Sequence, residues 1–333
     1  GQYNIAVGSA ALATATTASN NVAVGRNALL SSTTGEENVA IGSLSLDANT
    51  TGSYNQAIGA NTLTANTTAN YNIAVGRNTL YANTTGAYNI GIGSFALDAN
   101  TTANANIGIG YAALSANTTG TLNVAVGHES MDARTTGENN TAVGTYALGA
   151  STTANQNTAV GSSAGAAITT AVQNVTMGDS ALSALTTGHY NIAIGSQAGA
   201  ALVAGTENTF TGFLSGRYTG SADNPDYNTG FGSRTLYANT TGEKNVAMGA
   251  YALNQNTTAT LNTALGHNSM YANTTGQYNT AVGANALDAN TTASSNTAVG
   301  YDAMTANTTG TQNTAVGVQA MQVSTTAAYN TAV

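Results

Sequence analysis

The chain has 333 residues, of which only 6% are charged, and its formal net charge is −8. A typical soluble domain has about 25% charged residues. Six Lys plus Arg provide no basic surface for nucleic acid, and no apolar run approaches the roughly 18 residues that span a bilayer. We therefore expect no nucleic-acid partner and no membrane insertion by this segment.

An asparagine recurs every 17 residues from Asn4 to Asn330, with one longer step of 20 residues between Asn208 and Asn228. Such a period indicates a repeat architecture, in which each unit buries a core only by stacking on its neighbours. We count positions within a repeat from this anchor asparagine, which is position 0. The sequence thus predicts that the whole chain is one repeat array.

The array has three parts in chain order. Regular repeats occupy residues 1–160, an irregular segment occupies 161–232, and regular repeats return over 233–333. The regular phrase is Asn-x-Ala-Val-Gly-x-x-Ala-Leu-x-x-Asn-Thr-Thr-Gly/Ala-x-x, and residues 72–88 are a clear copy. Glycine at position 4 interrupts every apolar run, so each repeat predicts short strands and turns rather than a helix.

Alternation within one copy assigns its side chains to two faces. Ile73 and Val75 share one face of the expected strand, and Asn72, Ala74 and Gly76 share the other. We expect the Ile/Val face to be the core, with Leu80 at position 8 supplying the opposing wall. The predicted fold class is all-β, a parallel β-roll or flat β-solenoid of 17-residue coils in which two thin sheets face each other.

Equivalent side chains of successive coils should lie about 4.8 Å apart. A repeated charge would then repel its copies, whereas asparagine and threonine side chains can hydrogen-bond along the stack. The residues expected to form structural ladders in three adjacent coils are Asn55, Asn72, Asn89, Gly59, Gly76 and Gly93, with Val75 and Leu80 in the core.

The second strand face contains only small residues, as Asn72 and Ala74 illustrate. Small side chains let backbones approach closely, so we expect this face to pack against copies of itself around an axis. A closed cyclic homo-oligomer is the leading hypothesis. The alternative is a monomeric solenoid in which this face is hydrated.

The irregular segment lacks the large apolar residue at position 8 in three coils, where Gly165, Gly199 and Gly216 stand instead. Phe210 and Phe213 lie in the same region, and the three extra residues fall within residues 221–227. One interpretation is that bulky rings fill the gaps while a loop bulges outward. Another is that this unique segment sets the register between chains, because near-identical coils can slip by a whole repeat.

The same segment carries the candidate binding residues. A receptor or glycan contact is predicted from Arg217, Tyr218, Asp223, Asp226 and Tyr227. A calcium site using Asp223, Asn224 and Asp226 is a third interpretation, because oxygen ligands are present although a full ligand set is not.

Residues for catalysis are sparse. The three histidines, His128, His189 and His267, are widely separated, and no zinc spacing, phosphate loop or nucleotide fingerprint occurs. We predict no enzyme, no cofactor and no metal. Consecutive tyrosines before the anchors, at Tyr54, Tyr71 and Tyr88, predict a stacked aromatic ladder, or alternatively a strip for sugars.

The phrases Asn-Ile-Ala-Val-Gly at 72–76 and Asn-Thr-Ala-Val-Gly at 279–283 resemble the Ser-Val-Ala-Ile-Gly-type head repeats of trimeric autotransporter adhesins. The longer phrase resembles arrays in bacterial and phage tail-fibre-domain proteins. The resemblance covers essentially all 333 residues, although the 17-residue period is longer than the usual adhesin head repeat. It implies a parallel homotrimeric fibre outside a cell or on a virion, which supports attachment to a host-cell surface glycan or protein.

Two further functions remain open. The chain can be a self-assembling extracellular filament whose partner is itself. It can also be a β-solenoid that binds ice or another ordered surface through a flat threonine ladder. Adjacent Thr-Thr weakens the second idea, because only one threonine per repeat can point outward from a strand.

Overall fold

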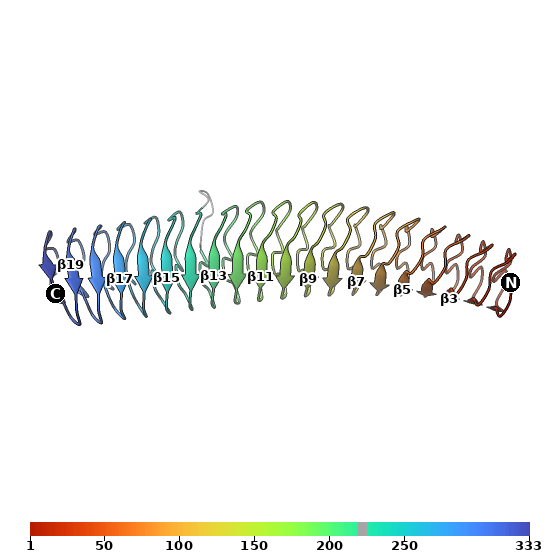
Figure 1. The fold of residues 1–333 in the computed structure, drawn as a ribbon, viewed down its shortest axis with the longest axis horizontal. Coiled ribbons are helices and arrows are strands. Elements are labelled where there is room, and N and C mark those ends of the chain that lie inside the picture. The colour runs from red at the N-terminus through yellow and green to blue at the C-terminus, as the bar shows by residue number, and fades with distance from the viewer. Residues whose placement is uncertain (219–224) are drawn as a thin grey trace. The chain divides into compact units, whose positions relative to one another are not determined.

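The computed structural model describes residues 1–218 and 225–333. The chain divides into two compact units, residues 1–163 and 164–333, and each is a parallel β-solenoid (Figure 1). In both units one coil takes about 17 residues, which confirms the predicted fold class. The described residues form no helix, and hence none that could cross a membrane.

One short strand per coil builds a single parallel sheet in each unit. The strands of the first unit are β1 (Ile5–Val7), β2 (Val22–Val24), β3 (Val39–Ile41), β4 (Gln56–Ile58), β5 (Ile73–Val75), β6 (Ile90–Ile92), β7 (Ile107–Ile109), β8 (Val124–Val126), β9 (Thr141–Val143) and β10 (Thr158–Val160). Those of the second are β11 (Val175–Met177), β12 (Ile192–Ile194), β13 (Thr209–Thr211), β14 (Thr229–Phe231), β15 (Val246–Met248), β16 (Thr263–Leu265), β17 (Thr280–Val282), β18 (Thr297–Val299), β19 (Thr314–Val316) and β20 (Thr331–Ala332).

The strands pair in phase, so each repeat position stacks on itself. Ile73 pairs with Ile90, and Val75 pairs with Ile92. The 20-residue step leaves this register intact, because Thr209 of β13 pairs with Thr229 of β14. The three extra residues are therefore accommodated outside the strands.

The prediction of which strand face forms the core is wrong. Ala74 is fully buried, whereas Val75 is only partly buried and Ile58 is 40% exposed. The reason is the narrow interior of the coil: a methyl group added at Gly91, the position equivalent to Ala74, would lie 2.5 Å from Cγ2 of Thr79. Regular coils carry only alanine or glycine at this position, and the larger β-branched side chains point outward.

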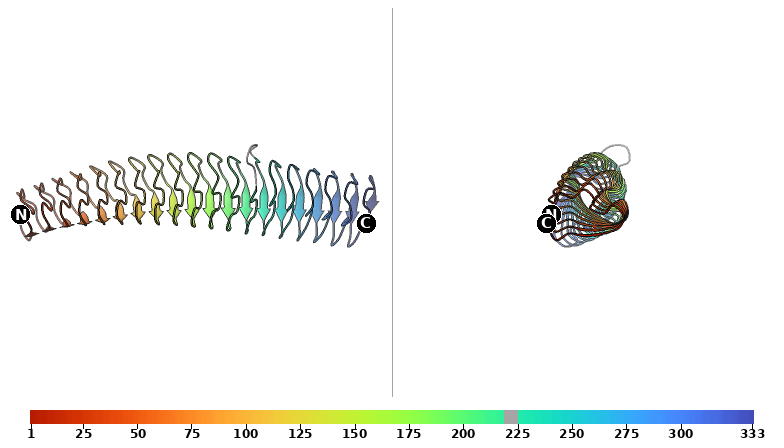
Figure 2. Two further views of the ribbon diagram at one scale, coloured as in Figure 1. Left: turned by 180° about the vertical axis from the view of Figure 1, so that it is seen from behind. Right: turned by 90° about the vertical axis from the view of Figure 1, so that its right-hand side faces the viewer.

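The wall opposite the sheet is a stack of turns and not the predicted second sheet. Leu80 is fully buried, as expected, but its φ of 50° places it in the left-handed region. Its backbone N–H donates to the carbonyl of Ala96 in the next coil, at 3.0 Å. Figure 2 shows the result, in which each coil is a flattened loop with its strand on one side and turns on the other.

The predicted asparagine ladder is present inside the coils. Both the backbone N–H and Nδ2 of Asn72 donate to Oδ1 of Asn55, at 3.0 and 3.2 Å, and Nδ2 also donates to the carbonyl of Gly86 at 2.9 Å. Oδ1 of Asn72 accepts in turn from the N–H of Asn89 at 2.9 Å. Each anchor side chain thus satisfies a buried backbone group of its neighbour.

A second asparagine ladder, at position 11, was not predicted. Nδ2 of Asn83 donates to Oδ1 of Asn66 at 3.1 Å and to the carbonyl of Gly86 at 2.9 Å. The Gly86 carbonyl therefore accepts from both ladders and joins them across the coil. The signal in the sequence was the recurrent Asn-Thr-Thr triplet, which also fits a simple turn.

The glycine column at position 4 has the structural role that was predicted. Gly76 has a φ of +131°, and a methyl group added to it would lie 2.7 Å from the carbonyl carbon of Gly93. Gly59 and Gly93 are equally constrained, with φ of +139° and +123°. Glycine avoids both the strain and the contact with the adjacent backbone.

The idea that aromatic rings fill the glycine gaps is confirmed for one ring. Phe210 occupies the alanine position and is fully buried, and a methyl group added at Gly216 would meet its ring at 2.5 Å. A methyl group added at Gly199 would lie 3.2 Å from Cδ2 of the same ring. Phe213, in contrast, is 50% exposed and fills no gap.

Candidate functional site

The outer face of each sheet is an uncharged apolar surface. At position 3, every coil of both units carries Val, Ile, Leu, Met or Phe except the coil with Thr211. Ile41 and Ile58 are 39% and 40% exposed, and Leu265 of the second unit is 45% exposed. A continuous exposed apolar patch of this kind marks an interaction surface.

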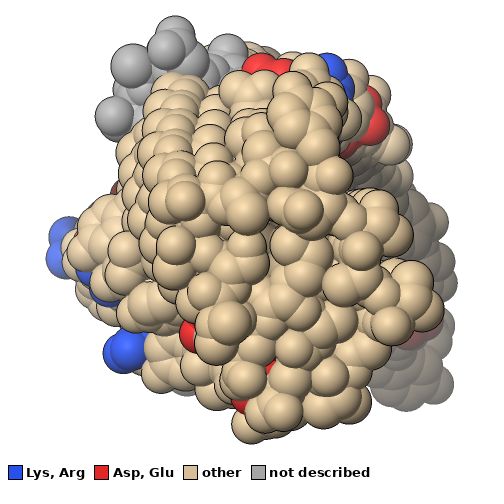
Figure 3. All heavy atoms as spheres, turned by 90° about the vertical axis from the view of Figure 1, so that its left-hand side faces the viewer, with Lys and Arg blue, Asp and Glu red and all other residues tan. Residues whose placement is uncertain are grey.

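Position 1 forms a second outward column beside the first. It is Ile or Val in seven of the ten strands of the first unit and Thr in seven of the ten strands of the second. No coil places a charged residue at position 1 or 3. Figure 3 views the molecule from its C-terminal end, where a few charged side chains stand among mostly uncharged residues.

The two adjacent threonines of each triplet have different environments. Thr84 is partly buried, and its Oγ1 donates to the carbonyl of Thr101 in the next coil at 3.0 Å. Thr85 is exposed. The exposed threonines of five successive coils of the first unit are Thr51, Thr68, Thr85, Thr102 and Thr119. The prediction that one threonine per repeat faces solvent is confirmed for these coils.

The predicted aromatic ladder is present. The rings of Tyr54 and Tyr71 stack with centroids 4.8 Å apart, and those of Tyr71 and Tyr88 with centroids 5.2 Å apart. The three side chains are 42%, 46% and 61% exposed. Their spacing matches the strand separation, so the ladder follows directly from the stacking of coils.

The predicted receptor residues take separate roles. Arg217 lies over the ring of Tyr218, 5.1 Å from its centroid, and both line a cavity. Tyr227 instead faces the ammonium of Lys244, and Oδ1 of Asp226 accepts from the N–H of Thr206 at 2.7 Å.

The calcium interpretation gains no support. Asp223 and Asn224 lie outside the described residues, and Oδ1 of Asp226 already accepts a backbone hydrogen bond. Residues 1–218 and 225–333 contain no group of three or more His, Asp or Glu side chains that could hold a metal ion.

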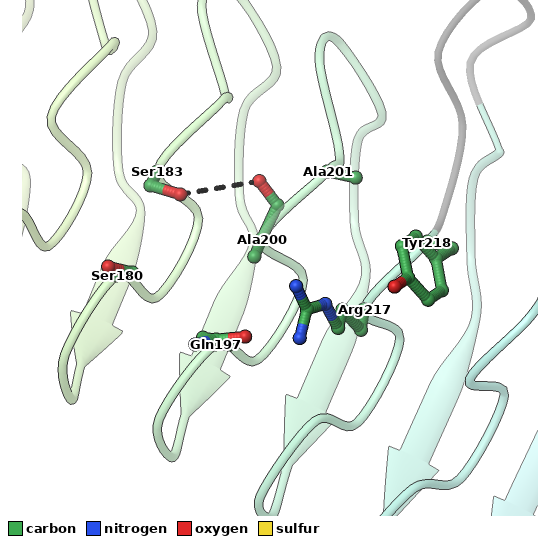
Figure 4. Close-up of a pocket in the computed structure, with 7 residues that line it drawn as sticks. All are labelled: Ser180, Ser183, Gln197, Ala200, Ala201, Arg217 and Tyr218. Carbon is green, nitrogen blue, oxygen red and sulfur yellow. Dashed lines mark hydrogen bonds between the residues drawn. The ribbon is translucent and has the colours of Figure 1, made fainter.

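The cavity beside Arg217 has a volume of about 360 Å³. Three coils of the second unit contribute its lining, which is Ser180, Ser183, Gln197, Ala200, Ala201, Arg217 and Tyr218 (Figure 4). These residues stand at positions 6, 9 and 10 of consecutive coils. Sequence reasoning identified Arg217 and Tyr218 but missed the others, because the signal lies only in columns read at a spacing of 17.

The histidines form no common site. His128 stacks on Tyr111 with ring centroids 5.3 Å apart, and its Nε2 lies 3.8 Å from the carboxylate of Glu129. In the other unit, Nδ1 of His189 accepts from the N–H of Val172 at 3.0 Å. Each imidazole therefore has local surface contacts of its own.

Some acidic side chains at position 9 are partly withdrawn from water. Burial raises the pKa of Asp47, Asp98 and Asp288 above the ordinary value, with backbone N–H groups acting in the opposite direction. In each of the three, Oδ1 is buried and accepts no hydrogen bond from the described part of the chain. Ionisation of these three carboxylates in the folded chain therefore costs free energy.

No protein-family model and no curated protein matches the chain. The surfaces of the two units therefore provide the evidence for function.

Proposed function

We propose that this chain is a structural segment of an extracellular fibre, in a cell-surface adhesin or a phage tail fibre, that supports attachment to a cell. In this proposal the fibre is a parallel homotrimer. The observation that carries the proposal is the uncharged face at positions 1 and 3 of each sheet, which is apolar at position 3 in both units, apart from Thr211, and at position 1 in most of the first unit.

The burial pattern changes which face joins the chains. The small Asn/Ala face lies inside each coil, with Asn72 and Ala74 fully buried, so the prediction that it packs against other copies is wrong. The Ile/Val face replaces it as the interchain surface. Because equivalent coils of parallel copies carry identical residues, they can pack together at one level.

The extent of this face can be stated for each unit. With coils about 4.8 Å apart and about 3.3 Å per residue, ten three-residue strands cover about 480 Å² in projection. A standard protein interface buries about 800 Å² per partner, so the face of each unit supplies a substantial part of such an interface. Exposed β-branched side chains supply the apolar area that drives association.

Native mass measurement tests the assembly. We expect three copies at micromolar concentration, the number implied by the resemblance to trimeric fibre repeats. Replacing Ile41, Ile58 and Val75 together by lysine should dissociate the particle, because a column of like charges would have to be buried at the interface. A wild-type chain that is monomeric at this concentration would contradict the proposal.

The matched control places the same charges on the same three coils. Thr51→Lys, Thr68→Lys and Thr85→Lys alter the exposed threonine column and should leave the copy number unchanged. Circular dichroism should show retained β-structure in both triple variants. Equal dissociation by both sets would mean that added charge, and not the Ile/Val face, decides assembly.

Binding to an ordered surface such as ice is the second candidate, because the exposed threonine column is regular and uncharged over successive coils. It is weaker, since Oγ1 of Thr84 is occupied by a backbone carbonyl and only one column remains free to match a surface. Thermal hysteresis that is abolished in the triple threonine variant would favour it over the fibre. Self-assembly into a filament of undefined length would instead appear in the native mass measurement as a broad distribution of particle masses with no fixed copy number.

A further inference from the structure

The cavity beside Arg217 exists because three successive coils differ in bulk at the same positions. Small residues, Ser183 and Ala200, occupy position 9 in two coils, and position 9 of the third is Arg217. The large side chains of the third coil therefore form one wall of a shallow space over its neighbours. In Figure 4 the guanidinium of Arg217 extends toward Ala200 and Gln197, with Tyr218 beside it.

Arg217 supplies a positive charge to this wall. Its guanidinium lies 5.1 Å from the ring centroid of Tyr218, and Tyr218 in turn packs edge-on against Tyr237 with centroids 5.0 Å apart. Within residues 1–218 and 225–333, no carboxylate lies within ion-pair distance of this guanidinium. An arginine held in place by aromatic rings is suited to bind an anion through paired N–H groups.

The cavity also contains an acceptor that lacks a donor. Oε1 of Gln197 is buried, and no described residue donates a hydrogen bond to it. The backbone of Gln197 is fixed, because its N–H donates to the carbonyl of Asp179 at 2.8 Å. The Gln197 side chain lines the cavity, so rotation of its amide can turn Oε1 toward a ligand hydroxyl, which would remove the cost of an unsatisfied buried acceptor.

We propose that this cavity binds an acidic sugar. The anionic group of the sugar accepts from Arg217, a ring hydroxyl donates to Oε1 of Gln197, and the hydroxyls of Ser180 and Ser183 line the polar side. The exposed ring of Tyr218, 47% accessible, offers an apolar surface to the C–H face of the sugar. A volume of about 360 Å³ accommodates one or two sugar units and falls at the lower end for ligand sites.

The inference rests on the proposed attachment function, for which it names the ligand class. It differs from the contact expected from sequence, because Asp226 and Tyr227 do not line the cavity. The required chemistry is a sugar that carries both an anion and free hydroxyls. A carboxylated sugar and a sulfated sugar share that chemistry, and separate arms of the test distinguish them.

Ligand-observed NMR and calorimetry on the full chain provide the test, with glucuronic acid, galactose 6-sulfate, methyl glucoside and sodium sulfate as probes. We expect one or both acidic sugars to bind with a dissociation constant in the millimolar range and the neutral sugar to bind at least tenfold more weakly. Arg217→Gln should weaken acidic-sugar binding about tenfold or more, because the charge-assisted hydrogen bonds are lost.

Arg77→Gln is the matched control, because Arg77 also lies over an aromatic ring, 6.0 Å from the centroid of Phe95, but outside the cavity. It should leave binding unchanged. Tyr218→Ala should weaken binding while its backbone hydrogen bond to Tyr237 keeps the coil in place. Thermal unfolding of each variant checks that the fold is retained.

Three outcomes would overturn the proposal: no binding by either acidic sugar, equal binding by wild type and Arg217→Gln, or sulfate binding as strongly as the sugars. Native mass measurement distinguishes a failure of the cavity proposal from a failure of the proposed function. A trimer that binds no acidic sugar refutes the cavity assignment alone, whereas an acidic-sugar-binding monomer refutes the assembly alone.

Discussion

Oδ1 of Asn117 receives no hydrogen bond within the described chain because Arg134, and not asparagine, occupies position 11 of the next coil. Arg134 is fully buried, and burial lowers its pKa to about 10. Its guanidinium donates to the carbonyl of Gly137 at 3.0 Å, to Oγ of Ser151 at 2.9 Å and to the carbonyl of Ala154. One charged residue thus interrupts a ladder that is continuous in the preceding coils.

Restoring that ladder should stabilise the first unit. In Arg134→Asn, the new Nδ2 can donate to Oδ1 of Asn117. The variant also removes the free-energy cost of burying a charged guanidinium, which arginine carries at any pH below its lowered pKa. We expect the free energy of unfolding to rise because a buried charge is removed, while the unsatisfied acceptor passes from Asn117 to the new side chain, whose Oδ1 faces Ser151 as that of Asn307 faces Ser324. Chemical denaturation measures the change, and hydrogen exchange of the amides around Asn117 locates it.

The reverse substitution is the control for this prediction. Asn100→Arg places a guanidinium in a regular coil, where it removes the donor to Oδ1 of Asn83. It should lower stability. A less stable Arg134→Asn variant would show that the three guanidinium hydrogen bonds outweigh the penalty of burial.

Breaking the anchor ladder should cost more than removing a surface hydroxyl. Asn72→Ala leaves the buried N–H of Asn89 without its acceptor and removes one of the two donors to Gly86. We expect a loss of about 2–4 kcal/mol, from an orphaned donor and a weakened acceptor. Thr85→Ala, on the exposed column of the same coil, should change stability by less than about 0.5 kcal/mol. Comparable unfolding midpoints for the two variants would contradict the ladder as a source of stability.

Stability should rise on mild acidification because of the position 9 carboxylates. Burial raises the pKa of Asp98, so the folded chain binds the proton more tightly than the unfolded chain. Stability therefore falls as pH rises through the raised pKa, and below the ordinary value of 3.8 Asp98 is protonated in both states.

Asp98→Asn removes this titration. The variant should be more stable than wild type at pH 7 and should show a flatter dependence between pH 7 and pH 4. Glu36→Gln, at an exposed side chain, serves as the control and should leave the pH dependence unchanged. Unfolding midpoints measured across this range decide the matter, and a parallel profile for Asp98→Asn would count against the burial argument.

Glycine at position 4 should be intolerant of alanine, unlike glycine within the strand. Gly76→Ala forces a side chain into a φ of +131° and against the backbone of Gly93, so we expect a loss of at least about 1–3 kcal/mol. Gly91→Ala introduces the residue found at position 2 of the preceding coil, Ala74, and its contact is with the side chain of Thr79. Pairing it with Thr79→Ser removes that contact. Similar losses for Gly76→Ala and the Gly91→Ala/Thr79→Ser pair would refute the distinction.

Much of the fold follows from the repeat alone. The anchor spacing predicts parallel stacking, and in-phase stacking brings Asn55, Asn72 and Asn89 together regardless of the shape of the coil. The position of Leu80 in the core and the stacking of Tyr54 on Tyr71 follow by the same reasoning. For the candidate site, the break in the pattern predicted Arg217 and Tyr218, because unusual side chains in a regular array stand out.

The sequence by itself determined the period, the strand type and the residues that stack. Only the tertiary structure decided which strand face is inside. Alternation places Ala74 and Val75 on opposite faces, but it does not give the width of the interior, which determines which of the two faces fits there. Left-handed turns such as that at Leu80 close each coil tightly, and the narrow interior admits only the small side chain. The cavity beside Arg217 likewise depends on the stacking of coils, which places Ser180, Gln197 and Arg217 side by side although they are distant in the chain.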